Sequence, residues 1–258
     1  MPLLYAILIA VVEGLTEFLP ISSTGHMILT AKLLRLPDSE FLGSFEIVIQ
    51  LGAILAVLIT YGRRLFSDRR VLYRVAAAFA PTAVIGFILY KAIKQYLLGN
   101  AAVVLASLLL GGIIIVIFEK YHREKPTAAA DIGDITVRQA VIIGFCQALA
   151  VVPGVSRAGA TVIGGLALGL KRRVIVEFSF LIAVPTMAAA AGLDLLKSGA
   201  AFNRQDALTL LVGFVVAFAV ALLAIRWFLR FVQTRTFTAF GVYRIVLAIV
   251  MGLVLFRL

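Results

Sequence analysis

Apolar segments make up almost the whole chain, and two short polar strings are their main interruptions. Of the 258 residues, 62% are hydrophobic and 14% are charged, whereas about a quarter of the residues of a soluble domain are charged. The mean hydropathy is +1.08. These values predict an all-α polytopic membrane protein with a single integral membrane domain, residues 1–258. The apolar segments cover about 2–20, 21–36, 41–61, 72–97, 101–118, 137–152, 156–170, 174–197, 208–233 and 237–257.

Three of these segments are too short to cross a bilayer. A full span needs about 20 residues, and the segments 21–36, 137–152 and 156–170 are shorter. Each of them adjoins a polar string. We therefore predict that residues 2–36 and 137–170 form two re-entrant helical hairpins beside about six transmembrane helices. Irregular backbone at membrane depth is tolerated where it lines a cavity or is buried in protein.

Lysine and arginine residues collect in four clusters between the apolar segments. Cytoplasmic loops of membrane proteins are enriched in these residues, so we place all four clusters in the cytoplasm and both termini outside. The first hairpin then enters from outside and the second from the cytoplasm. The same rule explains the net charge of +11 without a nucleic acid as partner. The clusters comprise Arg63, Arg64, Arg69, Arg70 and Arg74; Lys120, Arg123, Lys125 and Arg138; Lys171, Arg172 and Arg173; and Arg230 with Arg235.

The two halves of the chain, about 1–118 and 119–258, resemble each other weakly. Because the hairpins enter from opposite sides, we predict an inverted-topology repeat, and proteins of this kind place their site near the bilayer midplane. At an offset of 134, the aligned pairs are Glu13 with Gln147, Leu15 with Leu149, Ser22 with Ser156 and Gly25 with Gly159.

The first polar string, residues 13–26, carries two acids, three hydroxyls and a histidine. Glu13 and Glu17 are four residues apart, so they share one helix face. Two like charges this close favour a bound cation or proton, and hard cations such as Mg²⁺ and Ca²⁺ prefer oxygen ligands. The alternative is a pair of acids near the outer interface without a ligand.

The end of this string can start a helix. Pro20 breaks the preceding one, and Ser22, Ser23 and Thr24 are good N-cap residues. His26 lies within one helical turn of Ser22 and Ser23, so we expect its ring to reach a hydroxyl.

The second polar string, residues 153–161, has the chemistry of an anion site. Gly154 and Gly159 let the backbone approach a ligand closely. Ser156 can cap a helix whose first N–H groups bind anions. Arg157 adds a bidentate fork for phosphate oxygens, and Thr161 follows one turn later on the same face. The alternative for Arg157 is an ion pair with Glu17 or Glu13 and no ligand.

Other polar residues of the apolar segments give weaker signals. We expect Glu46 and Gln50, which share a helix face, to line the same cavity. Glu177 is interpreted as a helix-end counter-charge for the preceding basic run, and Arg244 as the partner of an acid.

Both polar strings resemble the signature strings of the bacterial undecaprenyl pyrophosphate phosphatases, the bacitracin-resistance family. The strings are Glu-Gly-Leu-Thr-Glu-Phe-Leu-Pro-Ile-Ser-Ser-Thr-Gly-His at 13–26 and Pro-Gly-Val-Ser-Arg-Ala-Gly-Ala-Thr at 153–161, and residues 45–52 and 177–185 also look like segments of that family. The resemblance implies an integral enzyme of the bacterial plasma (inner) membrane, with a site that opens toward the periplasm or the exterior. Its substrate would be the C55 isoprenoid pyrophosphate and its product the monophosphate carrier of cell-wall precursors. The family also depends on a divalent cation.

The resemblance assigns roles residue by residue. The acidic pair of the family falls on Glu13 and Glu17, and its serine-histidine group on Ser22, Ser23 and His26. Its phosphate-binding string falls on Ser156, Arg157 and Thr161. This chain departs from the family at Ala158, where a serine is frequent, so that hydroxyl is dispensable here or replaced by water.

Three readings of the mechanism and function stay open at this point. In the first, Ser23 attacks the terminal phosphorus while His26 or Glu17 takes its proton, and Arg157, Thr161 and the N–H groups near Ser156 hold the phosphate. In the second, the same pair activates a water molecule. The third is a lipid-phosphate transporter or flippase, because inverted repeats and broken helices are also transporter features. A fourth, an acid-phosphatase-like lipid phosphatase, is disfavoured because Ile163 stands where that class has a histidine. Whether the protein forms a homodimer is also left open.

Overall fold

The computed structural model describes residues 1–37, 39–92, 95, 97, 100–124, 129, 131–198 and 206–257. Lys125, one of the predicted cytoplasmic basic residues, lies outside them. In this described part, pairing of β type is limited to one isolated bridge between Ala129 and Leu170. The helices are α1 (Leu3–Thr16), α2 (Ser23–Leu33), α3 (Glu40–Ser67), α4 (Arg69–Ala92), α5 (Ala101–Tyr121), α6 (Val137–Ala148), α7 (Arg157–Ala167), α8 (Arg172–Ser198), α9 (Ala207–Phe231) and α10 (Thr238–Arg257), with 3-10 turns η2 (Ile132–Asp134) and η3 (Leu149–Val151).

Six of the described helices are long and apolar enough to cross a membrane: α3, α4, α5, α8, α9 and α10. Their outer faces carry large exposed apolar side chains, such as Phe87 (72% exposed) and Ile88 (71%) on α4. Such surfaces are rare on soluble monomers but are expected in contact with lipid. The prediction of an all-α polytopic membrane protein is therefore confirmed.

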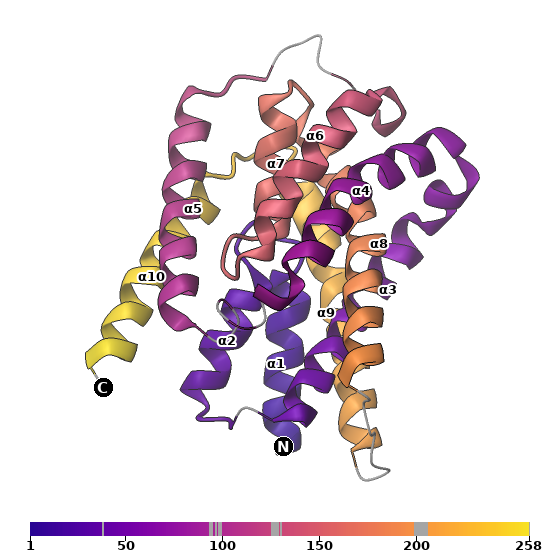
Figure 1. The fold of residues 1–258 in the computed structure, drawn as a ribbon. Coiled ribbons are helices and arrows are strands. Elements are labelled where there is room, and N and C mark those ends of the chain that lie inside the picture. The colour runs from indigo at the N-terminus through magenta and orange to yellow at the C-terminus, as the bar shows by residue number, and fades with distance from the viewer. Residues whose placement is uncertain are drawn as a thin grey trace.

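The remaining four α-helices form two short hairpins that enter the bundle from opposite ends. The pair α1 and α2 starts at the end where the N-terminus lies and turns back, whereas α6 and α7 do the same from the other end (Figure 1). The longest of the four, α1, has 14 residues and so spans about 21 Å, less than the hydrocarbon core of about 30 Å. Their re-entrance in a bilayer and their relation by an inverted repeat stay predictions.

The basic clusters gather at one end of the bundle. The α3–α4 turn, the last turn of α5, the first turn of α8 and the last turn of α9 all lie opposite the two termini (Figure 1). The chain direction of every described helix therefore matches the order of loops that the positive-inside rule predicts.

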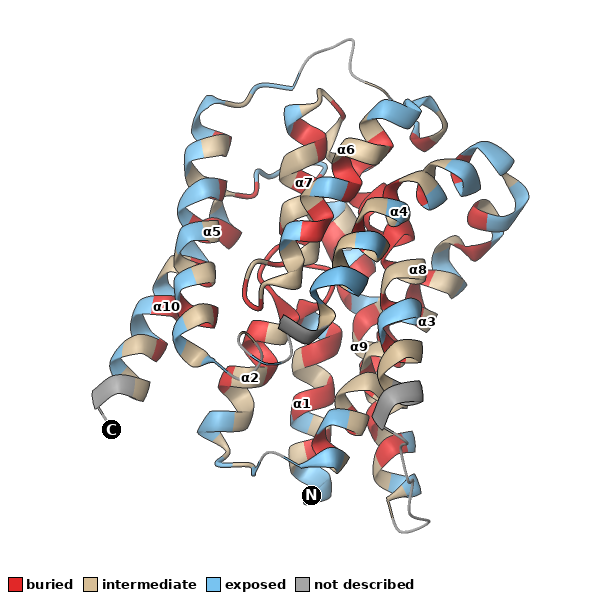
Figure 2. Ribbon diagram, viewed as in Figure 1, coloured by how far each residue is buried: buried red, intermediate tan, exposed pale blue. Residues whose placement is uncertain are grey.

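Small residues let the hairpin helices approach their neighbours closely. A Cβ on Gly14 of α1 would meet the carbonyl oxygen of Ala217 at 2.7 Å, and a Cβ on Gly144 of α6 would overlap the backbone of Ala78 in α4. Close backbone approach through small residues is the usual packing of helices in membranes. Buried residues gather where the two hairpin tips meet, while exposed ones cover the outer faces of α4, α5 and α10 (Figure 2).

Candidate active site between the hairpin tips

Two helices start at the hairpin tips with the same unusual cap. Ser22 precedes α2 with φ 71°, and its hydroxyl oxygen accepts from Gly25 N–H at 3.3 Å. Ser156 precedes α7 with φ 76° and accepts from Gly159 N–H at 3.1 Å. A positive φ is uncommon outside glycine, and here it turns each chain sharply into its helix. The predicted cap at Ser156 is confirmed, and of the three candidates in the first string Ser22 is the cap. Both tips thus present a helix N-terminus, which favours anions.

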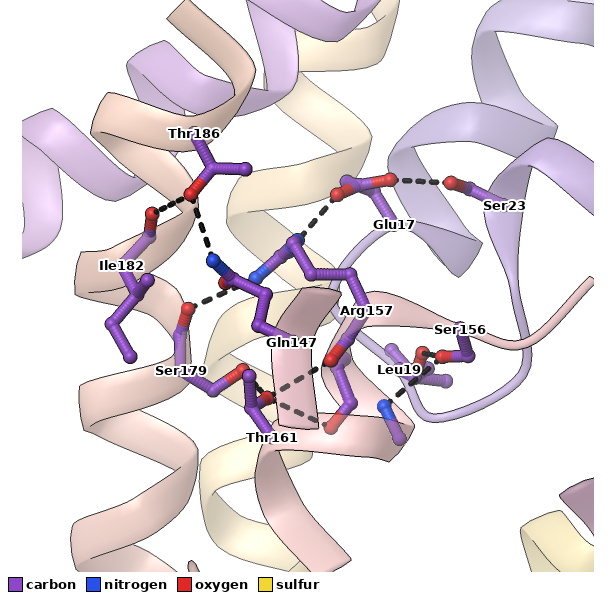
Figure 3. A network of polar contacts seen from close by, with 12 residues as sticks. Glu17, Leu19, Ser23, Gln147, Ser156, Arg157, Thr161, Ser179, Ile182 and Thr186 are labelled. Carbon is purple, nitrogen blue, oxygen red and sulfur yellow. Dashed lines mark hydrogen bonds and ion pairs between the residues drawn. The ribbon is translucent and has the colours of Figure 1, made fainter. Parts of the chain in front are cut away.

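Glu17 links the two tips. The Ser23 hydroxyl donates to Glu17 Oε2 through a short hydrogen bond, and Arg157 Nη2 donates to Glu17 Oε1 at 2.9 Å. Arg157 Nη1 donates to the backbone oxygen of Ser179 on α8, also at 2.9 Å. These contacts join side chains 140 residues apart (Figure 3). The ion pair that was the alternative reading of Arg157 is present, and a phosphate would compete with Glu17 for the same guanidinium.

A cavity of about 130 Å³ lies between the tips. Ligand pockets for whole drug-sized molecules measure about 300–1,000 Å³, so this cavity suits a polar head group and leaves a long chain outside. Gln50, as predicted, is among the lining residues; Glu46 is not. The lining residues are Glu17, Ser22, Ser23, Thr24, Gln50, Ala150, Val152, Pro153, Gly154, Ser156, Arg157 and Met187.

Glu13 is not among the residues that line the cavity. Its side chain is fully buried in α1, and neither carboxylate oxygen has a hydrogen-bond partner among the described residues. Burying a carboxylate without compensation is costly, so the group fits a bound proton or a hard cation. In the described part of the chain, no three acidic, histidine or cysteine side chains cluster as a metal site. A cation at Glu13 and Glu17 would thus need further oxygen ligands from substrate or solvent.

His26 does not bond a serine hydroxyl, and that expectation is wrong. Its Nδ1 lies 2.8 Å from the backbone oxygen of Ser22, and its Nε2 lies 2.8 Å from the hydroxyl of Tyr243 in α10. A carbonyl oxygen can only accept, so Nδ1 carries a proton. The helical turn brings the ring to a carbonyl four residues back, and that oxygen also accepts from the backbone N–H of His26 at 3.1 Å. A carbonyl oxygen has two lone pairs, so it can accept both hydrogen bonds. No motif in the sequence pointed to Tyr243.

Thr161 supports Arg157 rather than facing the cavity. Its buried hydroxyl contacts Ser179 Oγ at 2.7 Å and the backbone oxygens of Arg157 and Ala158 at 3.0 and 3.1 Å. Ser179 therefore holds both Arg157 and Thr161 against α8. In the sequence, Ser179 stands out only as part of the segment 177–185.

Arg244 was expected to pair with an acid, and this is wrong. The guanidinium, 1% exposed, donates to five backbone oxygens, those of Pro20, Ser107, Leu108, Gly154 and Val155, at 2.9 to 3.3 Å. The oxygens of Pro20, Gly154 and Val155 lie at the hairpin tips, where no helical N–H satisfies them, and the buried cation takes that place. Those of Ser107 and Leu108 lie inside α5. Arg244 thereby fastens both tips to α5.

The structure also shows what surrounds Gly154, predicted to approach a ligand, and Glu177, predicted to be a counter-charge. Gly154 has φ +92°, and a Cβ there would meet the backbone oxygen of Val104 at 2.6 Å. Its close approach is thus to α5, although it also lines the cavity. Glu177 accepts from Arg173 at 2.9 Å and lies 3.8 Å from Arg64, which confirms its role as a counter-charge.

One family model and several known proteins match nearly the whole chain. The family model described as bacitracin resistance protein BacA matches residues 6–250. The chain is 50% identical over 245 residues to the undecaprenyl-diphosphatase of Aquifex aeolicus, which covers 95% of each chain. It is 47% identical to the undecaprenyl-diphosphatase of a Sulfurihydrogenibium species, over 96% of this chain and 98% of that one. The undecaprenyl-diphosphatase of Wolinella succinogenes is also 47% identical, over 97% of both chains.

Proposed function

This chain belongs to the bacitracin resistance protein BacA family, and from this membership we propose that it is an undecaprenyl-diphosphate phosphatase. The enzyme hydrolyses undecaprenyl diphosphate to undecaprenyl phosphate and inorganic phosphate. The relatives named undecaprenyl-diphosphatase match over nearly their whole length. This activity regenerates the monophosphate carrier of cell-wall precursors, and the family name connects it with bacitracin resistance.

The observation that carries the proposal is the contact between Ser23, Glu17 and Arg157 inside the cavity. A hydroxyl that donates to a carboxylate is arranged for activation as a nucleophile. The guanidinium beside it offers a planar fork to phosphate oxygens. Two helix N-termini, at Ser22 and Ser156, add donors for the same anion.

We infer the following mechanism for these residues. The diphosphate enters the cavity while its isoprenoid tail stays in lipid. The terminal phosphate draws Arg157 from Glu17, and the freed carboxylate takes the Ser23 proton. Ser23 Oγ then forms a bond to the terminal phosphorus as the bond to the bridging oxygen breaks. Glu17 passes the proton from Ser23 to that oxygen, and undecaprenyl phosphate leaves. Water hydrolyses the phosphoserine, with Glu17 taking the proton of that water and returning one to Ser23.

The base in this scheme is Glu17 and not His26. The Ser23 hydroxyl already donates to Glu17, whereas both ring nitrogens of His26 are occupied by Ser22 and Tyr243. His26 fixes the backbone at the start of α2 and so positions Ser23. Direct attack by a water activated at Glu17 is the rival mechanism.

A divalent cation fits the buried acids. Glu13, with Glu17, would hold Mg²⁺ or Ca²⁺, and phosphate oxygens and water would supply the remaining ligands, as is common at Mg²⁺ sites. Such an ion would neutralise charge on the transferred phosphoryl group.

We further propose that the site faces the outside of the bacterial inner membrane. Gln50 and Met187 line the cavity, and Gln50 lies in the half of α3 nearer its start at Glu40, at the end of the bundle with both termini (Figure 1). The basic clusters mark the other end as cytoplasmic. A homodimer stays a prediction.

The test is phosphate release by the purified protein from undecaprenyl diphosphate in detergent micelles, with and without a chelator. Wild-type protein should release phosphate, and the chelator should suppress it. Ser23→Ala and Glu17→Gln should both be inactive, and rapid quench should trap phosphate on Ser23. Substantial activity in Ser23→Ala with none in Glu17→Gln would replace the covalent route by water attack. A wild-type protein that moves lipid phosphates across vesicles but releases no phosphate would be a transporter.

A further inference from the structure

Gln147 is a buried amide next to the site that the mechanism above does not use. It lies at the inner end of α6 and is 1% exposed. Its Nε2 donates to Thr82 Oγ1 at 2.9 Å and to Thr186 Oγ1 at 3.0 Å. Its Oε1 is buried and has no partner among the described residues. A buried amide oxygen without a partner costs free energy and needs an explanation.

The orientation of this amide is fixed by its neighbours. Thr82 donates its hydroxyl proton to the backbone oxygen of Gly144 at 2.9 Å, and Thr186 donates to that of Ile182 at 2.8 Å. Each hydroxyl has one proton, so toward Gln147 both can only accept. A flipped amide would place Oε1 against two acceptors. The threonines therefore force Nε2 toward themselves and Oε1 away from them.

Arg157 reaches the same face of α8 as Gln147. Arg157 bonds the oxygen of Ser179, and Gln147 bonds Thr186, which itself bonds the oxygen of Ile182. Residues separated by three, four and seven positions share a helix face, and Figure 3 shows both side chains converging on it. Arg157 Nε–H is also buried, and no residue in the described ranges accepts from it. One lone acceptor and one lone donor thus lie on a single face beside the cavity.

We propose that Gln147 is a positioning residue for Arg157. When the terminal phosphate draws the guanidinium from Glu17, Oε1 of Gln147 accepts from Nε–H and fixes the plane of the fork, so that both Nη groups face the phosphate. Thr82 and Thr186 act through Gln147 by setting its amide. This inference rests on the proposed function, because it presumes that Arg157 binds the terminal phosphate.

The principal variant is Gln147→Met, which keeps the length of the side chain and removes the acceptor. Loss of a hydrogen bond to a charged group should lower kcat/KM on the order of 10- to 100-fold. The matched control is Gln139→Met, eight residues earlier in the same helix, whose amide binds Thr136 and the oxygen of Leu168 at the basic end. The control should lose thermal stability and keep wild-type kcat/KM.

A second arm leaves Gln147 in place. The double variant Thr82→Val with Thr186→Val keeps the shape of both side chains but frees the amide to turn. It should also lower kcat/KM, by less than Gln147→Met does. If Gln147→Met fails to fold, the double threonine variant tests whether the orientation of the Gln147 amide affects catalysis.

A double-variant cycle separates positioning from a general structural effect. Lysine has no Nε–H, so adding Gln147→Met to Arg157→Lys should cost little beyond Arg157→Lys alone. Multiplicative losses, or wild-type kcat/KM in Gln147→Met or in the double threonine variant, would overturn the role of Gln147. Wild-type protein that releases no phosphate from undecaprenyl diphosphate would instead overturn the proposed function itself.

Discussion

Replacement of Arg244 by lysine should destabilise the junction of the two hairpin tips. The guanidinium has five N–H donors, and each is used on one of five backbone oxygens. Lysine keeps the charge but has three donors. The oxygens of Ser107 and Leu108 lie inside α5 and also accept helical N–H groups, whereas those of Pro20, Gly154 and Val155 lie outside helices and are bound by two different nitrogens of Arg244. Lysine has a single nitrogen, so at least one of these three carbonyls loses its partner in Arg244→Lys.

The size of the effect follows from these counts. An unsatisfied buried polar group costs about 1–3 kcal/mol, so one of them lowers the free energy of unfolding by about 1–3 kcal/mol. This is a large fraction of the 5–15 kcal/mol typical of folded proteins. Activity should fall as well, because Gly154 and Val155, whose oxygens bind Arg244, directly precede Ser156 and Arg157.

The measurement is unfolding of the purified protein in detergent, followed by helical circular dichroism during titration with a denaturing detergent. Gly111→Ala provides an independent perturbation, because a Cβ there would overlap Arg244 Nη2. Gly62→Ala is its matched control, since a Cβ at this helical position meets nothing within 4 Å. The control should be neutral or more stable by up to about 1 kcal/mol.

A free energy of unfolding of Arg244→Lys within about 0.5 kcal/mol of the wild-type value, the range of an ordinary surface substitution, would show that the guanidinium does not stabilise the tips through these hydrogen bonds. Equal effects of Gly111→Ala and Gly62→Ala would show that the guanidinium does not hold the tips in this position.

Three further predictions address the site, the topology and the basic end. Arg157→Lys should remain folded and lose most of its phosphate release, because lysine lacks the planar fork; near-normal turnover would remove Arg157 from the phosphate site. In a Cys146→Ala background, Arg70→Cys should react with an impermeant thiol reagent only from the cytoplasmic side and Lys32→Cys only from outside; the reverse pattern would invert the orientation. The pKa of Asp131 lies below its usual range, because this carboxylate accepts hydrogen bonds from an arginine side chain and a backbone N–H. The stabilising effect of the Asp131 carboxylate is present above about pH 4 and fades as pH falls through that lowered pKa. Asp131→Asn should therefore lower the free energy of unfolding by about 1 kcal/mol or less at neutral pH and leave it unchanged in acid. A loss of stability that persists in acid would contradict the ion pair.

Local features of the sequence determined the helices and the composition of the site. The lengths of the apolar runs predicted six long spans and two short hairpins, because a bilayer fixes the length of a spanning helix. Ser156 is recognisable as a cap because Pro153 and Gly154 end the preceding helix and serine is a favoured N-cap residue. Six of the predicted site residues line one cavity, since both polar strings stand where helices must break: Glu17, Ser22, Ser23, Gly154, Ser156 and Arg157.

The tertiary structure alone decided which groups meet across the bundle. Arg244 binds carbonyls rather than an acid, and His26 meets Tyr243 217 residues away. Nothing in helical periodicity specifies such partners, because in an apolar environment any backbone oxygen without its helical N–H competes with a carboxylate for a buried cation. The broken helices create these oxygens, and only the packing of the two hairpins shows where they point.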